Sequence, residues 1–312
     1  AATAITEAAP PLAWPALVNA MHDLPADLPA SAPEAASPPP PSKATRQSVI
    51  SVRRWTDALV SVRVTRDPAY RFTAGHYARL GLAGADGAIA TRPLSIASAT
   101  TDPHLEFVCT LVPDGELSAR LASCAPGDDA YVDRTSYGFL TVDGLAPGPD
   151  LWMLATGTGI APFLSILREP RVWTAFERIV VVHSVRLAAE LAPAAPIDAL
   201  ARAPSAASGT ARLTYLPVAT REPGATALDA RIPAMLEDGR LAAAAGLPID
   251  VARSRVMTCG NPSMSRDVRR VLAARGFAPV RRNTPGQMTF ENYWQNPPGA
   301  ERTPAAPGAI TP

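Results

Sequence analysis

The segment LWMLATGTGIAPFLSIL, residues 151–167, constrains the fold of this chain more than any other feature. An unbroken apolar run leads straight into the turn Gly157-Thr158-Gly159, and a second apolar segment with Pro162 near its start follows at once. A strand without polar residues must be covered on both faces, as strands of parallel sheets are. Proline near the start and apolar residues beyond it favour a helix. The segment therefore predicts a strand, a glycine turn and a helix of an α/β domain.

The same alternation continues towards the end of the chain. Further buried strands are expected at 178–184, 211–219 and 254–260. Helices are expected at about 226–243 and 263–275. Strands that alternate with helices predict a parallel sheet with both faces covered.

The first half of the chain has a different pattern. Short runs rich in apolar and β-branched residues occupy 48–55, 58–66, 76–82, 104–112 and 129–135. Turn signals separate these runs, and one helical segment, 116–124, interrupts them. Many short strands with a single helix predict an antiparallel barrel. Pro147-Gly148-Pro149 marks the boundary between the two patterns.

Composition argues against several classes of function. The formal net charge of +1 argues against nucleic acid as a partner. Cys109, Cys124 and Cys259 are widely spaced, which argues against a cysteine-bound metal and fits a reducing compartment. The sequence contains neither an apolar run long enough to span a bilayer nor the start of a secretory signal, so we expect a cytoplasmic protein.

Residues at the carboxyl ends of the predicted parallel strands indicate a nucleotide site. The turn Gly157-Thr158-Gly159 precedes a helix whose first N–H groups suit a pyrophosphate, although a tight turn without a ligand has the same residues. The strand 178–184 is followed by Arg186 and not by an acidic residue, which suits the 2′-phosphate of NADP. Arg221 and Arg231 follow the next strand and extend this basic set.

Polar residues of the predicted barrel indicate a second cofactor beside the first. In RPLSIAS, residues 92–98, Arg92 would bind phosphate and Ser95 would hydrogen-bond near the reactive N5 of a flavin. The stretch Gly115-Glu116-Leu117-Ser118 opens the lone helix of this half, where amides and a hydroxyl suit pyrophosphate. A half-buried strand and a capped helix without a ligand would have the same sequence. In the other half, Cys259 is either a small buried residue or a thiol beside the nicotinamide ring.

Residues 49–294 resemble the bacterial ferredoxin (flavodoxin)–NADP reductases. The motifs that occur in the order of that family are FTAGHY (72–77), RPLSIAS (92–98), DGELS (114–118), ATGTGIAPFLSIL (155–167) and CGNPSM (259–264). MTFENYW (288–294) is similar to the family's carboxyl terminus. The resemblance implies a two-domain fold in which an antiparallel FAD-binding β-barrel precedes a parallel-sheet NADP-binding α/β domain.

Four segments are accordingly expected. They are a disordered Ala/Pro-rich arm (1–46), the FAD-binding barrel (47–147), the NADP-binding domain (148–294) and a flexible tail (295–312). The arm and the tail lie outside the resemblance.

The resemblance also implies a set of site residues. Contacts with FAD are expected from Arg92, Leu94, Ser95, Ser98, Gly115, Glu116, Leu117, Ser118, Tyr293 and Trp294. Contacts with NADP are expected from Gly157, Thr158, Gly159, Arg186, Arg221 and Arg231. Ser95, Cys259 and Glu291 would tune and position the reacting groups, without acting as acid or base in the hydride step. Leu94 departs from the family, which usually has a tyrosine at this position.

The function that the resemblance implies is FAD-dependent transfer of electrons between NADPH and a one-electron carrier, an acidic ferredoxin or flavodoxin. Hydride would pass from NADPH to flavin N5, and electrons would leave singly. Two alternatives use the same residues: the reductase component of an oxygenase system, and a flavin or nucleotide sensor without redox activity. A sensor has no need of all the nicotinamide-side motifs. A monomer without nucleic-acid or membrane partners is expected.

Overall fold

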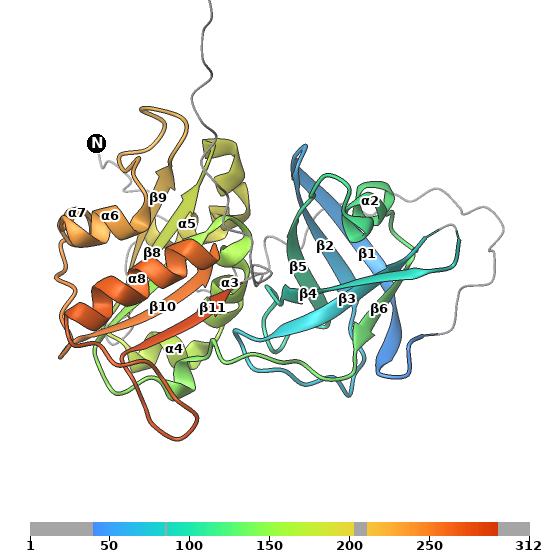
Figure 1. Ribbon diagram of the computed structural model, residues 1–312. Coiled ribbons are helices and arrows are strands. Elements are labelled where there is room, and N and C mark those ends of the chain that lie inside the picture. The colour runs from blue at the N-terminus through green and yellow to red at the C-terminus, as the bar shows by residue number, and fades with distance from the viewer. Residues whose placement is uncertain (1–39, 85, 203–210, 293–312) are drawn as a thin grey trace, which may run out of the picture.

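Two β-sheets form two lobes that lie side by side in the computed structural model (Figure 1), which describes residues 40–84, 86–202 and 211–292. The first lobe holds a six-stranded sheet of order β4-β3-β6-β1-β2-β5, and the second a five-stranded sheet of order β11-β10-β7-β8-β9. The predicted fold class, an antiparallel sheet followed by a parallel α/β unit, is confirmed.

The strands of the first lobe are antiparallel throughout. They are β1 (Ala44–Thr56), β2 (Leu59–Thr65), β3 (Tyr77–Ala83), β4 (Ile89–Ser95), β5 (His104–Thr110) and β6 (Asp129–Asp133), with the helix α2 (Glu116–Ser123) after β5. The edge strands β4 and β5 approach each other, because Ile96 bridges to Phe107 just beyond β4. The sheet therefore curls around an apolar core that includes Val62, Leu80 and Phe107.

The start of β1 differs from the predicted boundary. The expected arm extended to residue 46, but Ala44, Thr45 and Arg46 pair with Asp133, Val132 and Tyr131 of β6. These residues have no periodic apolar pattern, so the sequence did not predict the pairing.

The strands of the second lobe are all parallel. They are β7 (Asp150–Thr156), β8 (Arg178–Val185), β9 (Arg212–Ala219), β10 (Ser254–Gly260) and β11 (Met288–Asn292). The helices are α3 (Ala161–Leu167), α4 (Pro170–Ala175), α5 (Ala195–Arg202), α6 (Ile232–Glu237), α7 (Arg240–Ala245) and α8 (Pro262–Ala274). Short 3₁₀ turns are η1 (Val142–Gly144), η2 (Gly157–Ile160) and η3 (Ala188–Ala194).

Each central strand of this sheet packs on two separate apolar clusters. Leu151 and Met153 of β7 belong to the cluster that contains Phe163 of α3. Trp152 and Leu154 belong to the cluster that contains Val268 of α8. Both faces are covered, which is why the strand reads as a continuous apolar run.

One predicted helix of this lobe is wrong in its extent. The segment 226–243 is not a single helix but contains α6 and α7, separated at Gly239, whose φ of 85° lies in the left-handed region. Glycine adopts this conformation without strain, so it ends one helix and caps the next. The helices α4 and α5 and the strand β11 were not predicted.

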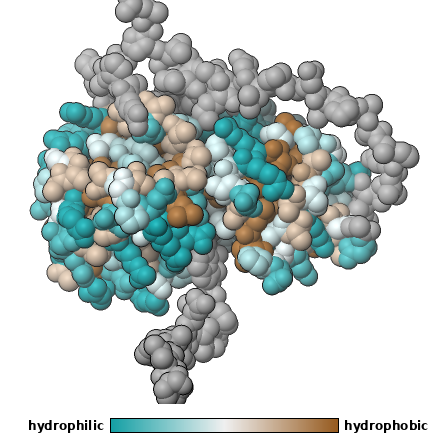
Figure 2. Space-filling view, turned by 90° about the horizontal axis from the view of Figure 1, so that it is seen from above, coloured by the Kyte–Doolittle hydropathy of each residue, from teal (hydrophilic) through white to brown (hydrophobic). Residues whose placement is uncertain are grey.

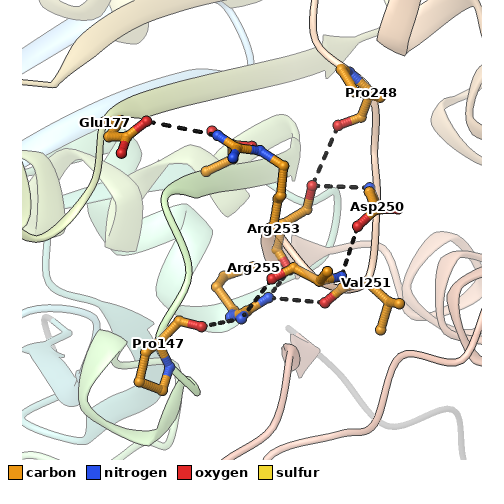
Figure 3. A network of polar contacts seen from close by, with 10 residues as sticks. Pro147, Glu177, Pro248, Asp250, Val251, Arg253 and Arg255 are labelled. Carbon is orange, nitrogen blue, oxygen red and sulfur yellow. Dashed lines mark hydrogen bonds and ion pairs between the residues drawn. The ribbon is translucent and has the colours of Figure 1, made fainter.

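The segment that joins the lobes is fastened to the start of β10 (Figure 3). The buried guanidinium of Arg255 donates hydrogen bonds to the carbonyl oxygens of Ala146 at 2.7 Å and Val251 at 3.2 Å, and to that of Pro147. A Cβ at Gly148 would collide with the same guanidinium, so the chain turns here only with glycine. Pro147-Gly148-Pro149, predicted as a boundary, is thus a rigid junction.

The lobes also share an apolar cluster. Leu59, Ala97 and Val108 of the first lobe pack with Phe163 and Ile166 of α3. In Figure 2, brown residues of the first lobe form a band beside the second lobe. The two sheets are therefore held against each other by buried surface as well as by the chain.

Candidate functional site

A cleft of about 1230 Å³ lies between the lobes and is lined by both of them. The second lobe contributes the carboxyl ends of β7, β8 and β9 and the starts of α6 and α8. The first lobe contributes parts of β4 and β5 and the start of α2. Ligands of open α/β sheets collect at the carboxyl ends of the strands, so the position fits a binding site.

Residues of β4 form one wall of the cleft. Arg92 is exposed there, and its Nη1 donates a hydrogen bond to the carbonyl oxygen of Thr91 at 2.8 Å. Leu94 is half-buried, packs against the barrel core and also lines the cleft. The structure therefore presents a guanidinium and an apolar surface side by side on one strand.

The start of α2 continues this wall with Gly115, Glu116, Leu117 and Ser118. The Oγ of Ser118 accepts a hydrogen bond from the N–H of Val112 at 2.9 Å, which closes the turn before the helix. The preceding residue, Asp114, has a φ of 59° and is the only described non-glycine residue with positive φ. Such strained backbone clusters at ligand sites, and it places the first amides of α2 at the cleft.

The glycine turn after β7 forms the facing wall. Gly157 and Thr158 line the cleft, and Gly157 has a φ of 54° with nothing within 4 Å of the position of an added Cβ. Gly159 does not line the cleft, and its contact with NADP stays a prediction. A Cβ there would collide with the carbonyl oxygen of Cys259, so this glycine permits close packing of η2 on β10.

The three predicted arginines of the second lobe all line the cleft. Arg186 directly follows β8, Arg221 follows β9, and Arg231 precedes α6. The N–H of Arg221 donates to the carbonyl oxygen of Arg186 at 2.9 Å, which holds the two strand ends together. The sequence prediction that these residues converge is supported by this geometry.

An acidic partner of Arg186 was not predicted. The Nη2 of Arg186 donates to Oε1 of Glu190 at 2.8 Å, and Oε2 of Glu190 accepts from the N–H groups of Arg186 and Leu187 at 2.9 and 3.3 Å. Burial acts to raise the pKa of Glu190, but these hydrogen bonds outweigh it and the pKa is lowered. Glu190 is thus a fixed anion that orients Arg186 at the cleft.

His183 supports the glycine turn from below and was also missed. It is fully buried near the end of β8, with Nε2 2.9 Å from the carbonyl oxygen of Gly157 and Nδ1 3.4 Å from the hydroxyl of Tyr215. Burial lowers the pKa of His183 to about 4. The neutral ring therefore holds Gly157 in place across the physiological pH range. The available signal was a histidine inside an otherwise apolar strand.

Ser95 and Glu291 meet where the two lobes join. Ser95 ends β4, and its Oγ donates to Oε1 of Glu291 on β11 at 3.4 Å. Cys259 is opposite Glu291 in the register of β10 and β11 and is fully buried. Burial raises the pKa of Glu291 to about 7, against the opposing effect of the Ser95 hydrogen bond. None of the three lines the cleft described above.

The remaining predicted residues do not add to the site. Ser98 is fully buried, and its Oγ accepts a hydrogen bond from the N–H of Glu106 at 3.2 Å, so its side chain ties the loop after β4 to β5. The expectation that this side chain contacts a cofactor is therefore not supported. Tyr293 and Trp294 lie outside the described residues.

The described residues contain neither a cluster of metal ligands nor a membrane-spanning helix. No cluster of three or more metal-ligating side chains occurs in 40–84, 86–202 and 211–292. Among these same residues, no helix is both long and apolar enough to cross a membrane.

The donor set fits two phosphate-bearing cofactors. Arg92 and the first turn of α2 provide charge and amides on one wall, and Arg186, Arg221 and Arg231 provide charge on the other. The open space over Gly157 leaves room for a ligand against the backbone. These residues would hold the pyrophosphate of FAD and the phosphates of NADP respectively.

Comparisons with known proteins agree with this geometry. Residues 153–270 match the model of the oxidoreductase NAD-binding domain. The chain is 38% identical over 265 residues to ferredoxin–NADP reductase A of Sorangium cellulosum. The alignment covers 84% of this chain and 93% of that protein. It is 40% identical over 247 residues to the flavodoxin/ferredoxin–NADP reductase of Escherichia coli. This alignment covers 79% of this chain and 97% of that protein.

A solved structure supports the same assignment. The ferredoxin NADP⁺ reductase of Neisseria gonorrhoeae, determined with bound FAD and NADP, has a TM-score of 0.75 at 33% identity and covers 81% of this chain and 100% of its own. The similarity spans both lobes and nearly the whole length of these relatives. The chain therefore belongs to the bacterial family of ferredoxin (flavodoxin)–NADP reductases.

Proposed function

We propose that the chain transfers electrons between NADPH and a ferredoxin or flavodoxin through bound FAD. The observation that carries the proposal is one cleft with arginines on both walls, beside the point where Ser95 and Glu291 join the lobes. The names of the relatives give the same pair of reactants. FAD supplies the exchange between a two-electron hydride and single electrons, which nicotinamide does not perform readily.

The first lobe would bind FAD. Arg92 and the amides at the start of α2 would hold its pyrophosphate, because both face the cleft and both carry positive charge or partial charge. Leu94 would contact the flavin ring through its exposed surface. Tyr293 and Trp294, which follow β11, are proposed to stack on the rings of FAD.

The second lobe would bind NADPH. Gly157 and Thr158 would face the pyrophosphate, and Arg186, oriented by Glu190, would pair with the 2′-phosphate together with Arg221 and Arg231. This arrangement would bring the nicotinamide to the join between the lobes, where holding the reactants in contact accelerates transfer.

Side chains at the join would set the environment of the reacting atoms. Ser95 would donate a hydrogen bond, and Glu291 would hold a proton on its carboxylate near neutral pH. Cys259 would shape the floor on which the nicotinamide rests. The proposed roles require no side chain to accept the hydride.

The carrier, the location and the domain limits complete the proposal. An acidic carrier would dock on arginines at the open edge of the cleft, which gives steering at low salt. We propose that the protein acts in the cytoplasm, as a monomer, with an FAD domain that begins with β1 at Ala44 and ends at 147, and an NADP domain at 148–294. An oxygenase-linked reductase would share the same hydride step, so carrier assays with ferredoxin and flavodoxin separate the two.

The test is reduction of the purified protein by NADPH. The proposal expects bound FAD, bleaching of the flavin absorption on addition of NADPH, and reduction of ferricyanide. A protein without flavin, or a flavin that NADPH does not bleach, would contradict the proposal. The second outcome is that expected of a sensor.

A further inference from the structure

The two walls of the cleft are linked by α3, whose two ends contact different lobes. At its start, α3 continues η2, which carries Gly157 and Thr158 at the cleft. At its end, Arg168 and Glu169 reach the loop that follows β4. All seven residues of α3 are buried, so the helix is fixed along its length.

The first link is made by Arg168. Its Nη1 donates to the carbonyl oxygen of Ala97 at 2.6 Å, and the same atom lies 3.8 Å from Oε2 of Glu106 on β5. The side chains of Arg168 and Glu106 are 10% and 13% exposed. The N–H of Ala97 donates to the carbonyl oxygen of Glu106 at 2.8 Å, so both backbone polar groups of Ala97 are held. Charge-assisted hydrogen bonds shielded from water are among the stronger ones.

The second link is made by Glu169. Its Oε1 accepts a hydrogen bond from Oγ1 of Thr100 at 2.6 Å. Ala97 and Thr100 belong to the loop after β4. Arg168 and Glu169 are consecutive residues that directly follow α3. Two hydrogen bonds between the same pair of segments fix orientation as well as distance, which a single bond does not.

The linked segments are the ones that would hold the reactants. Ala97 belongs to RPLSIAS, in which Leu94 lines the cleft and Ser95 contacts Glu291. α3 spans only about 10 Å, at 1.5 Å per residue. Because the helix between them is short and buried, a displacement at Arg168 would shift Thr158 relative to Leu94 by a similar amount.

We infer that Arg168 and Glu169 are positioning residues that set the distance between the nicotinamide and the flavin. The inference rests on the proposed function, because it concerns the geometry of the same hydride step. Neither side chain lines the cleft, and each is bound to the loop after β4, so both would act through that loop. Their loss would lower the rate of hydride transfer while the affinities for both cofactors remain.

The experiment measures the limiting rate of flavin reduction by NADPH in Arg168→Gln and Thr100→Val. Thr100→Val removes only the hydroxyl that binds Glu169, so it keeps the inference testable if Arg168→Gln fails to fold. The control is Arg275→Gln, because Nη2 of Arg275 also donates to a backbone carbonyl, that of Leu236, at 2.6 Å but within the second lobe alone.

We expect Arg168→Gln to reduce at a rate lower by at least about tenfold, because small misplacements of reacting groups are costly. FAD content and the dissociation constant of NADP⁺ would stay at the values of the wild type, and Thr100→Val would show a smaller loss of the same kind. Arg275→Gln would lower the melting temperature without slowing reduction.

Three outcomes overturn the inference. Wild-type rates in Arg168→Gln and Thr100→Val would overturn it alone, as would losses of rate that only follow losses of bound FAD or of NADP⁺ affinity. A wild-type protein that NADPH does not reduce would overturn the proposed function and the inference together.

Discussion

Ser95 on β4 and Glu291 on β11 form a hydrogen bond of 3.4 Å that joins the antiparallel sheet to the parallel one. The two residues are far apart in the chain, and each ends or nearly ends its strand. The Ser95 hydroxyl donates to the Glu291 carboxyl oxygen across the join, so the charge on Glu291 acts at the point where the lobes meet. Its ionisation therefore affects both the stability of the assembly and the environment of the reacting atoms.

The pH dependence of stability provides the first prediction. Burial raises the pKa of Glu291 from 4.5 to about 7, so the folded protein binds this proton more tightly than the unfolded chain does. Relative to Glu291→Gln, the free energy of unfolding of the wild type should fall by up to ~3 kcal/mol as the pH rises through this interval. Denaturant unfolding of both proteins across the interval measures the difference. A difference independent of pH would contradict the assignment.

Replacement of Arg186 tests nucleotide preference. Arg186→Ala should weaken NADPH by about tenfold or more, since a hydrogen bond to a charged group contributes roughly 1.5–3 kcal/mol, and should leave NADH unaffected. The matched control is Arg212→Ala, an exposed arginine at the amino end of β9, away from the cleft. Steady-state kinetics with both nucleotides give the ratio. An unchanged ratio in Arg186→Ala would exclude this residue from the 2′-phosphate site.

Leu94 gives a spectroscopic prediction. Leu94→Tyr would add an aromatic contact with the flavin ring, a contact type that contributes about 0.5–1.5 kcal/mol beyond burial, so FAD should be retained more tightly. A tyrosine in contact with flavin also quenches its emission by electron transfer. The wild type should therefore fluoresce more brightly than Leu94→Tyr at equal FAD content. Equal brightness would mean that Leu94 does not contact the ring, or that Tyr293 or Trp294 quenches from the other face.

The two glycines of the turn after β7 should respond differently to alanine. Gly157→Ala forces a left-handed conformation that costs about 1–2 kcal/mol and puts a methyl group into the cleft, so it should weaken NADPH binding in a folded protein. Gly159→Ala would collide with the carbonyl oxygen of Cys259 and should lower the melting temperature more. Melting curves and NADP⁺ titrations separate the effects. Equal loss of affinity in two equally stable variants would contradict the distinction.

The sequence predicts the fold because its two halves bury their strands differently. β7 is apolar on every residue between its ends, and β8 is apolar from Ile179 to Val182, as expected of a sheet covered on both faces. The single predicted helix at 226–243 failed at Gly239, where the backbone needs a positive φ that a periodic apolar pattern does not reveal. The start of β1 failed because Ala44–Arg46 are held by pairing with β6 and not by their own side chains.

The site was predictable where one local motif contains it. Gly157 and Arg186 sit at strand ends, and the sequence identifies strand ends. The sequence did not show that Ser98 and Gly159 lie away from the cleft lining, because the direction in which a residue faces within a short loop depends on what packs beneath it. His183 and Arg168 were missed because each acts through a partner far away in the chain, and such pairing leaves no spacing to read. Glu190 pairs with Arg186 only four residues earlier, a spacing that the sequence analysis did not use.

An anaerobic titration of the purified protein with NADPH, followed by the visible absorption of the flavin, tests the central claim most directly. The account predicts a spectrum of bound FAD, stoichiometric bleaching by NADPH, and recovery of the oxidised spectrum when an oxidised ferredoxin or flavodoxin is added. A flavin that stays oxidised in excess NADPH, or a protein that contains none, would contradict it.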